Sequence, residues 1–188
     1  SLQMFISALN KKRLQLISGF TLIEVLVVIG ILGILATVAL VAINPAEAQK
    51  KARDTQRLKD MSTLQSVIEQ YLQDNPGAGN ALTGTVSLSS STGTKVCGAG
   101  ANWLGVNLCP YANVIPVDPI NRATSVTDSL GASASQNSYY YFRSTALGYK
   151  LCTYLESASN KEKIKAINDG GNNDTTFEVF SASTITCP

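Results

Sequence analysis

One acidic residue at the head of a long apolar run constrains this chain more than any other feature of its sequence. Between Phe20 and Ile43 the sole charged side chain is Glu24, and most of the other residues are Val, Ile, Leu and Ala. As a helix, at about 1.5 Å per residue, the run reaches about 36 Å and can cross a hydrocarbon core of about 30 Å. The aliphatic side chains favour insertion by about 0.3–0.6 kcal/mol each and together outweigh one carboxylate. We therefore expect a membrane-spanning helix whose ionisable residue has a function.

The residues before the run indicate how this helix is oriented and processed. The basic triplet at 11–13 (KKR) is the only charged cluster before Glu24, and basic residues hold their end of a span in the cytoplasm. A secretory signal is cut after its apolar core, whereas here the small residues Ser18 and Gly19 precede it. Cleavage after Gly19 would leave the helix in place and create an amine on Phe20, one turn from Glu24. In a low dielectric these two charges attract strongly.

Two simpler interpretations of the same segment stay open at this point. One is an ordinary signal-anchor helix with Glu24 in the lipid headgroup region. The other is a buried core helix, which fits less well because the run has no polar face.

The leader and the run together resemble the processing signature of type IV pilins and type II secretion pseudopilins, a class III signal peptide. The resemblance rests on a basic leader, Gly19 before the cut, Phe20 after it, Glu24 at the fifth position of the processed chain, and an apolar helix. It implies that a prepilin peptidase cleaves between Gly19 and Phe20 and methylates the Phe20 amine. It also implies that Glu24 pairs with the Phe20 amine of an adjacent subunit during filament assembly.

The same resemblance implies an α+β pilin fold, in which a long N-terminal helix packs on a small antiparallel sheet. Residues 1–19 would be a cytoplasmic leader that is removed, and 20–43 a helix of the membrane or filament core. Residues 44–75 would continue as an amphipathic helix, and 76–188 would form a β-rich globular domain. Met4 is a candidate initiator within the leader, and a start further upstream is an equal alternative.

The helix is expected to change character where the apolar run ends. Asn44 resembles an N-cap, Pro45 suits the first helical position, and Glu47 stands where a capping box has its acid. Because Pro45 removes one helical hydrogen bond, we expect a kink or a brief break there. Gly30 and Gly33 weaken the helix before it, for close packing between helices or for local melting.

From Ala46 to Gln73 the pattern is that of an amphipathic helix, which residues 74–77 (DNPG) end. The apolar residues that share one face are Leu58, Met61, Leu64, Ile68, Tyr71 and Leu72. The charged residues of the early turns are Lys50, Lys51, Arg53, Asp54, Arg57, Lys59 and Asp60. We interpret these charges as a solvated surface near lipid headgroups, with ion pairs between filament subunits as the alternative.

Short β-type stretches separated by Gly, Ser, Thr and Asn follow. The candidate strands are Thr83–Ser89, Tyr139–Arg143, Tyr149–Leu155 and Thr176–Thr186, of which the first could equally be an irregular loop. The short link at 146–148 predicts an antiparallel hairpin, and this sheet would cover the apolar face of the helix. The tyrosines favour packing in the sheet over a stacking surface for a ligand or nucleic acid.

The four cysteines form no C-x-x-C pair, so the pattern argues against a four-cysteine zinc site. An even number in an exported domain favours disulfides, and three pairings are possible. We favour Cys97–Cys109, which closes a short Gly-rich loop, and Cys152–Cys187, which joins the C-terminal segment to a preceding strand as in many pilins. Free buried thiols are the alternative.

Two acidic loops invite comparison with calcium sites. The stretch 117–121 (VDPIN) is similar to one that leads into a calcium-binding loop of major pseudopilins, which would make Asp118 and Asp128 oxygen ligands. A plain turn at Asp118 and Pro119 is favoured, because the following segment is longer and Ser-rich. The loop 169–174 (DGGNND) lacks the EF-hand order and its bidentate Glu, so we expect a flexible loop without calcium.

Several classes of function are excluded by composition. The chain has no His, which excludes His-based triads, His general bases and His-ligated zinc. The formal net charge is +2 and falls further once the basic leader is removed, so nothing favours nucleic acid as a partner. No catalytic or cofactor-binding motif stands out, and we do not expect an enzyme.

We therefore expect a structural subunit of a type IV pilus or related filament, a helical homo-oligomer. Its partners would be membrane lipid before assembly, a prepilin peptidase, and an assembly platform with a separate ATPase, since the chain has no nucleotide-binding motif. It would span the cytoplasmic membrane once, with its N-terminus in the cytoplasm, and then enter a cell-envelope or extracellular filament. The alternatives are a pseudopilin of a type II secretion or DNA-uptake system and, from another class, a membrane-anchored exported enzyme or binding protein.

Overall fold

The computed structural model describes residues 19–77, 81–126 and 136–187. These fall into two compact units, of which the first ends at Asn44 and the second begins at Pro45. Each unit is described by itself.

The first unit contains helix α2, Leu22–Ile43, a 22-residue apolar helix. Thr21 caps its N-terminus and Asn44 its C-terminus, the latter with a φ of +46° in the left-handed region. Among the described residues α2 is the one helix long and apolar enough to span a membrane. The prediction of an apolar N-terminal helix is thus confirmed.

The second unit begins with helix α3, Pro45–Asp74, of 30 residues. Asn44 is therefore a one-residue interruption between two helices, at the position where Pro45 has no N–H to donate. The buried apolar face of α3 consists of Met61, Leu64, Val67 and Ile68. Leu58, Tyr71 and Leu72, expected on the same face, are partly buried.

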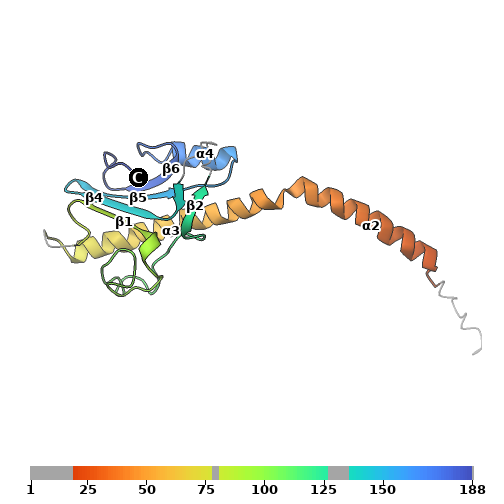
Figure 1. Ribbon diagram of the computed structural model, residues 1–188, viewed down its shortest axis with the longest axis horizontal. Helices are drawn as coiled ribbons and strands as arrows, with labels where there is room; N and C mark the ends of the chain where they lie inside the picture. The colour runs from red at the N-terminus through yellow and green to blue at the C-terminus, as the bar shows by residue number, and fades with distance from the viewer. Residues whose placement is uncertain (1–18, 78–80, 127–135, 188) are drawn as a thin grey trace, which may run out of the picture. The chain divides into compact units, whose positions relative to one another are not determined.

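An antiparallel sheet covers this face of α3, as Figure 1 shows. Its strand order is β1-β4-β5-β6. The strands are β1 (Val86–Ser89), β4 (Tyr141–Thr145), β5 (Gly148–Tyr154) and β6 (Thr176–Phe180). The expected hairpin is present, with Thr145 opposite Gly148 and Phe142 opposite Leu151. The α+β prediction of a long helix with a small antiparallel sheet is confirmed.

Some elements differ from the sequence expectation. The first strand starts at Val86 rather than Thr83, the strand expected at 139–143 lies at Tyr141–Thr145, and the last strand stops at Phe180 rather than Thr186. The pair β2 (Arg122–Val126) and β3 (Gln136–Ser138), helix α4 (Asn160–Ile167) and the turn η1 (Ser90–Thr92) were not expected. All four are short, with three to eight residues each, so their hydrophobic pattern repeats too few times to identify them.

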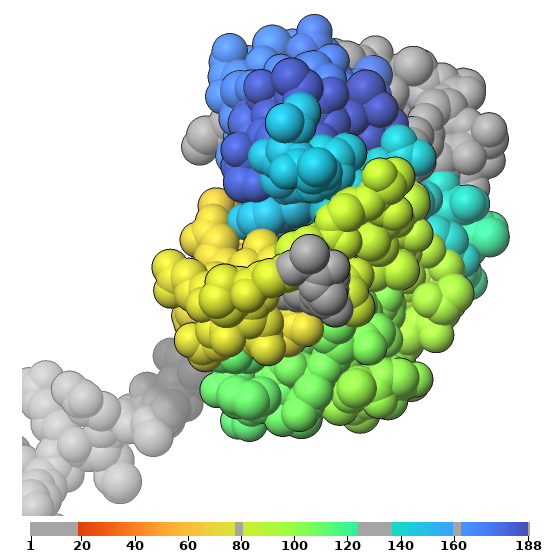
Figure 2. All heavy atoms as spheres, turned by 90° about the vertical axis from the view of Figure 1, so that its left-hand side faces the viewer, coloured from red at the N-terminus to blue at the C-terminus, as the bar shows by residue number. Residues whose placement is uncertain are grey.

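The core lies between α3, the sheet and the segment that connects β1 to β2. That segment contributes Trp103, Leu104, Leu108 and Ile115, all buried. Figure 2 looks at the end of this unit and shows the last turns of α3 (yellow) between that segment (green) and the β4–β5 hairpin (cyan). The buried tyrosines include Tyr140 and Tyr149, and the ring of Tyr149 stacks on Phe142 with 6.0 Å between centroids. Those two tyrosines are packed in the core, not presented as a stacking surface.

Candidate functional site

The peptide bond expected to be cut lies in an accessible segment. Gly19 and Phe20 precede α2 without regular structure, and both are exposed, Phe20 to 81%. A protease needs an extended, accessible backbone at the bond it cleaves. The local geometry at Gly19 and Phe20 therefore suits processing.

Glu24 closes a capping box at the start of α2. Its carboxylate oxygen Oε2 accepts the Thr21 backbone N–H at 3.0 Å and the Thr21 hydroxyl at 2.7 Å. In return the Thr21 Oγ1 accepts the Glu24 backbone N–H at 3.3 Å. These bonds satisfy amide donors that a helix N-terminus otherwise leaves unpaired. The sequence analysis missed the box, although Thr-x-x-Glu before an apolar run is its signature.

The surface of α2 is apolar around its whole circumference. None of its residues is buried within the described part of the chain, and Leu22 and Val41 are each 83% exposed. An apolar surface of this extent requires a covering of lipid or of other apolar helices. Side chains at Gly30 and Gly33 would meet open space in the isolated subunit, so the small size of these residues is not used within it.

In the second unit the charges of α3 are organised differently from the sequence expectation. Arg57 is 1% exposed, and it contacts Asp54 at 2.9 Å, Asp118 at 2.7 Å and Glu156 at 2.5 Å. The interpretation of Asp54 and Arg57 as solvated surface charges is therefore wrong. The carboxylates of Asp118 and Glu156 reach Arg57 from distant segments, and Asp54 binds Arg57 and the backbone N–H groups of Glu156 and Ser157. These partners balance the cost of desolvating the two charges.

Asp54 and Arg53 attach α3 to the chain that follows β5. The Asp54 carboxylate accepts the backbone N–H groups of Glu156 and Ser157, the latter at 2.7 Å. Arg53 donates to both carboxylate oxygens of Glu156, at 3.0 and 2.6 Å. Burial raises the pKa of Glu156, but the hydrogen bond from Arg53 and the charge of Arg57 outweigh it and lower the pKa overall. We call Arg53, Asp54, Arg57, Asp118 and Glu156 the ionic cluster.

Asp118, one of the two suggested calcium ligands, belongs to the ionic cluster. Its two oxygens bind Nε and Nη2 of Arg57, and Oδ1 also accepts the N–H groups of Ile120 and Asn121. The latter bonds form a turn, which is the interpretation that the sequence analysis favoured for this segment. Both oxygens are thus occupied beside a guanidinium, which opposes a second cation. Asp128 lies outside the described residues.

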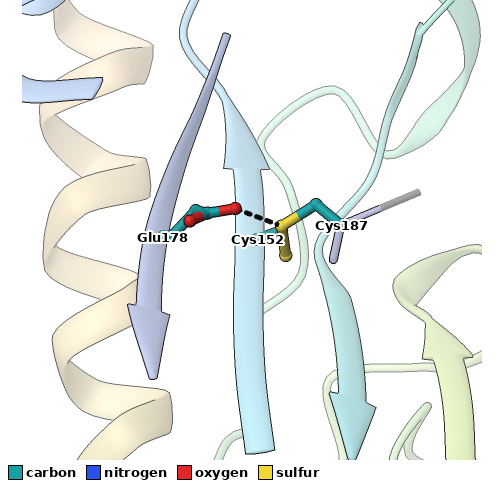
Figure 3. A group of neighbouring side chains, drawn as sticks. All are labelled: Cys152, Glu178 and Cys187. Atoms are coloured by element: carbon teal, nitrogen blue, oxygen red, sulfur yellow. Dashed lines mark hydrogen bonds between the residues drawn. A yellow bond between two sulfur atoms is a disulfide. The ribbon is translucent and has the colours of Figure 1, made fainter. Parts of the chain in front are cut away.

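Disulfides join the two pairs of cysteines that the sequence analysis favoured. One links Cys97 to Cys109 and the other Cys152 to Cys187. The second lies beside Glu178, whose Oε1 is 3.0 Å from the Cys187 sulfur (Figure 3). Cys152, Glu178 and Cys187 bring three potential metal ligands together. Sulfurs joined in a disulfide lack the thiolate charge that metal ligation uses, so this arrangement supports a covalent staple rather than a metal centre.

Comparison with known proteins identifies the N-terminal segment. A family model described as the prokaryotic N-terminal methylation motif matches residues 16–40. The chain thus carries the class III signal peptide of type IV pilins, and the match spans Gly19, Phe20 and Glu24. Neither the curated proteins nor the solved structures contain a match to the chain. The motif points to the precursor of a pilin-like or pseudopilin subunit and implies processing by a prepilin peptidase.

Proposed function

We propose that this chain is the precursor of a structural subunit of a type IV pilus or a related filament. The observation that carries the proposal is α2, an apolar helix of 22 residues that starts within the methylation motif and of which no residue is buried by the part of the chain that the structure describes. Such a helix needs a lipid covering before assembly and an apolar protein covering after it. A bundle of identical helices would supply this protein covering.

Processing would begin at the accessible bond between Gly19 and Phe20. A prepilin peptidase would remove residues 1–19 and methylate the new amine of Phe20. The basic triplet at 11–13 keeps this end in the cytoplasm, and α2 holds the subunit in the cytoplasmic membrane.

Glu24 would set the register between subunits. An unpaired carboxylate in an apolar bundle is strongly penalised, so a subunit is accepted at the position where the carboxylate finds a positive partner. The Phe20 amine of the adjacent subunit would supply that partner. In the isolated subunit the capping box holds the Glu24 carboxylate with neutral donors of Thr21, which a charged amine of a neighbouring subunit would displace.

The second unit would form the outer surface of the filament. The Cys152–Cys187 disulfide and the ionic cluster join segments far apart in the chain, and the Cys97–Cys109 disulfide closes a shorter loop. Two disulfides suit a domain exposed outside the cytoplasm. The energy for extracting subunits from the membrane would come from a separate ATPase of the assembly platform.

A pseudopilin of a type II secretion or DNA-uptake system shares the processing motif and is the second candidate. A calcium site at Asp118 would favour it, but Asp118 binds Arg57. Electron microscopy of the native cell surface distinguishes the two, because a pilus forms long surface fibres and a pseudopilus does not.

Mass spectrometry of the mature N-terminus tests the proposal directly. We expect a chain that begins at Phe20 with a methyl group on its amine. Retention of residues 1–19 in the mature protein would instead support a membrane-anchored enzyme or binding protein and contradict the filament proposal.

A further inference from the structure

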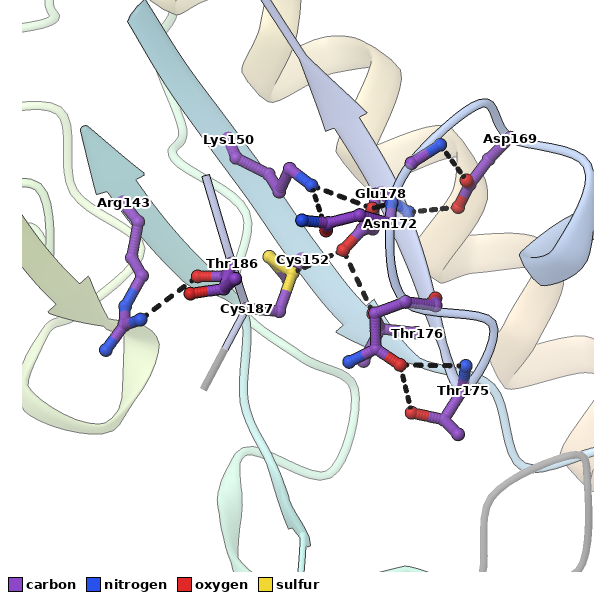
Figure 4. Close-up of a disulfide and its surroundings, with 12 residues drawn as sticks. Arg143, Lys150, Cys152, Asp169, Asn172, Thr175, Thr176, Glu178, Thr186 and Cys187 are labelled. Carbon is purple, nitrogen blue, oxygen red and sulfur yellow. Dashed lines mark hydrogen bonds and ion pairs between the residues drawn. A yellow bond between two sulfur atoms is a disulfide. The ribbon is translucent and has the colours of Figure 1, made fainter. Parts of the chain in front are cut away.

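A buried lysine meets a side-chain amide and a carboxylate at the edge of the sheet. Lys150, on β5, is 0% exposed, and its Nζ lies 2.7 Å from Asn172 Oδ1 and 2.9 Å from Glu178 Oε2 (Figure 4). The carbonyl oxygen of Ser183 is a third acceptor at 3.2 Å. The Phe180 ring lies 5.0 Å from the same nitrogen. The amine is thus withdrawn from water and held against the Asn172 carboxamide.

The loop that carries Asn172 is built to reach this point. Asp169 accepts the N–H groups of Gly171 at 2.7 Å and of Glu178 at 2.6 Å, which closes the loop against β6. The Asn172 N–H then donates to Glu178 Oε2 at 2.8 Å. A Cβ at Gly171 would lie 1.6 Å from that same oxygen, so only glycine permits this approach. The loop that resembles a calcium loop in sequence therefore encloses a carboxylate and presents an amide to a lysine.

These three groups have complementary chemistry. A primary amine is a nucleophile once it loses a proton, a carboxamide carbon is an electrophile, and a carboxylate in contact with the amine can carry the proton. Holding the reacting groups in contact replaces a bimolecular encounter by an intramolecular one, and effective molarities for such reactions reach about 10⁵ M and above.

We propose that Lys150 and Asn172 form an intramolecular amide bond, with Glu178 as the proton carrier. Glu178 accepts a proton from the Lys150 ammonium, and the neutral Nζ attacks Cγ of Asn172. The protonated Glu178 then gives its proton to the departing amide nitrogen and accepts the second proton, which Nζ loses as the new amide forms; this last proton leaves to solvent with the ammonia. A bond between Nζ and Cγ forms, the bond between Cγ and Nδ2 breaks, and one ammonia leaves; nothing is oxidised or reduced.

The surroundings support each step. Lys150 and Glu178 are both buried, so transfer of the proton, which makes both groups neutral, costs less there than in water. Asn172 lies at the exposed end of the group, which gives ammonia a path to solvent.

The proposed amide would be a second covalent link near β6, beside the Cys152–Cys187 disulfide. The disulfide joins Cys152 on β5 to Cys187, and the amide would join Lys150 on the same strand to the loop before β6. Strand β6 would then be enclosed by two covalent links, which restricts local opening at this edge of the sheet.

Peptide mass spectrometry of the full mature chain, reduced, denatured and digested with trypsin, tests the proposal. Acylated lysine is not cleaved by trypsin, so we expect peptide 144–161 joined to peptide 166–188, with a mass lower than the sum of the two peptide masses by one ammonia. The folded protein is incubated for a prolonged period before it is denatured and digested. An unlinked peptide that ends at Lys150 would then overturn the proposal.

Two neighbouring asparagines provide a matched control. Asn172→Ala removes the electrophile and should abolish the linked peptides, whereas Asn173→Ala should retain them. Linked peptides that persist in Asn172→Ala would assign the bond elsewhere and overturn the proposal.

The role of Glu178 is tested by Glu178→Gln, with formation of the Cys152–Cys187 disulfide as the measure of correct folding. Loss of a proton carrier should slow bond formation about a hundredfold or more. A parental rate in the folded variant would overturn the role of Glu178.

Discussion

Arg57 on α3 binds both carboxylate oxygens of Asp118, a residue 61 positions further along the chain. Both side chains are almost completely buried. This pair, with Asp54 and Glu156 beside it, holds α3 against the rest of the second unit.

Arg57→Met should destabilise the second unit severely. The substitution leaves the Asp118 carboxylate buried without its cation, and breaking a buried ion pair in this way costs about 3–5 kcal/mol. Denaturant unfolding of the mature chain followed by circular dichroism provides the measurement. The matched control is Lys51→Met, which removes an exposed charge from the same helix and should change stability by about 0.5 kcal/mol or less. Equal effects of the two variants would contradict the role of the ionic cluster.

Glu24→Ala should leave membrane insertion intact and block filament assembly. Removing the carboxylate makes the helix more apolar, so insertion is favoured, but the register contact between subunits is lost. Membrane fractionation and electron microscopy of the same cells measure the two effects. Normal filaments from this variant would refute the register role. If α2 is only an anchor, replacing residues 20–43 with an unrelated span should preserve function.

Thr21→Val separates helix capping from subunit pairing. The variant loses the hydroxyl of the capping box, which costs about 1 kcal/mol at the helix start, but it keeps the Glu24 carboxylate and the Phe20 amine. We therefore expect filaments to form, in contrast to Glu24→Ala. A loss of filaments as complete as in Glu24→Ala would show that the box, rather than the pairing, is the essential role of the carboxylate.

The second unit should lose stability as the pH rises above about 10. Burial, with the neighbouring Asp60 carboxylate, raises the pKa of Tyr140, and burial with the hydrogen bond to Glu69 raises the pKa of Tyr149. Above pH 10 the unfolded chain has released these protons and the folded chain has not, so unfolding is favoured by about 1.4 kcal/mol per pH unit for each tyrosine. Tyr140→Phe should reduce this slope by about 1.4 kcal/mol per pH unit, measured as the free energy of unfolding between pH 9 and 11. An unchanged slope would rule out the contribution of Tyr140.

Removing Cys152–Cys187 should cost more than removing Cys97–Cys109. The first pair is separated by 35 positions and the second by 12, so the larger loop restricts the unfolded chain more, by about 1 kcal/mol in the loop-entropy description. Paired Cys→Ser variants of each bridge, compared by denaturant unfolding, measure the difference. The reverse order would indicate that contacts in the folded state, and not chain entropy, dominate.

The elements that could be predicted from sequence are those with a local signal. Helix α2 follows from a run with a single charge, α3 from the spacing of Met61, Leu64 and Ile68, and the hairpin from two aromatic strands separated by a short link. The residues of the N-terminal motif could also be identified from sequence, because Gly19, Phe20 and Glu24 lie within one stretch of six residues.

What could not be predicted depends on contacts between distant segments. In the sequence, Arg57 looks like the exposed charged residues of the same helix. Only its contact with Asp118, which folding brings close, shows that it is buried. Helix α4 has eight residues, too few for a periodic pattern, and β2 and β3 stabilise one another rather than being specified singly. The meeting of Lys150 with Asn172 likewise depends on the strand pairing of β5 with β6.

The capping box at Thr21 has a further consequence for which chains can join a filament. In an isolated subunit the Glu24 carboxylate is held by two donors from its own chain, both neutral. A neighbour must outcompete them, and an ammonium does so because a charge-assisted hydrogen bond is about twice as strong as a neutral one. An uncut precursor carries a peptide nitrogen in place of that ammonium and offers no advantage. Under the proposed assembly, only a processed subunit can displace the Thr21 donors from the Glu24 carboxylate of its neighbour. An unprocessed subunit therefore does not join the filament.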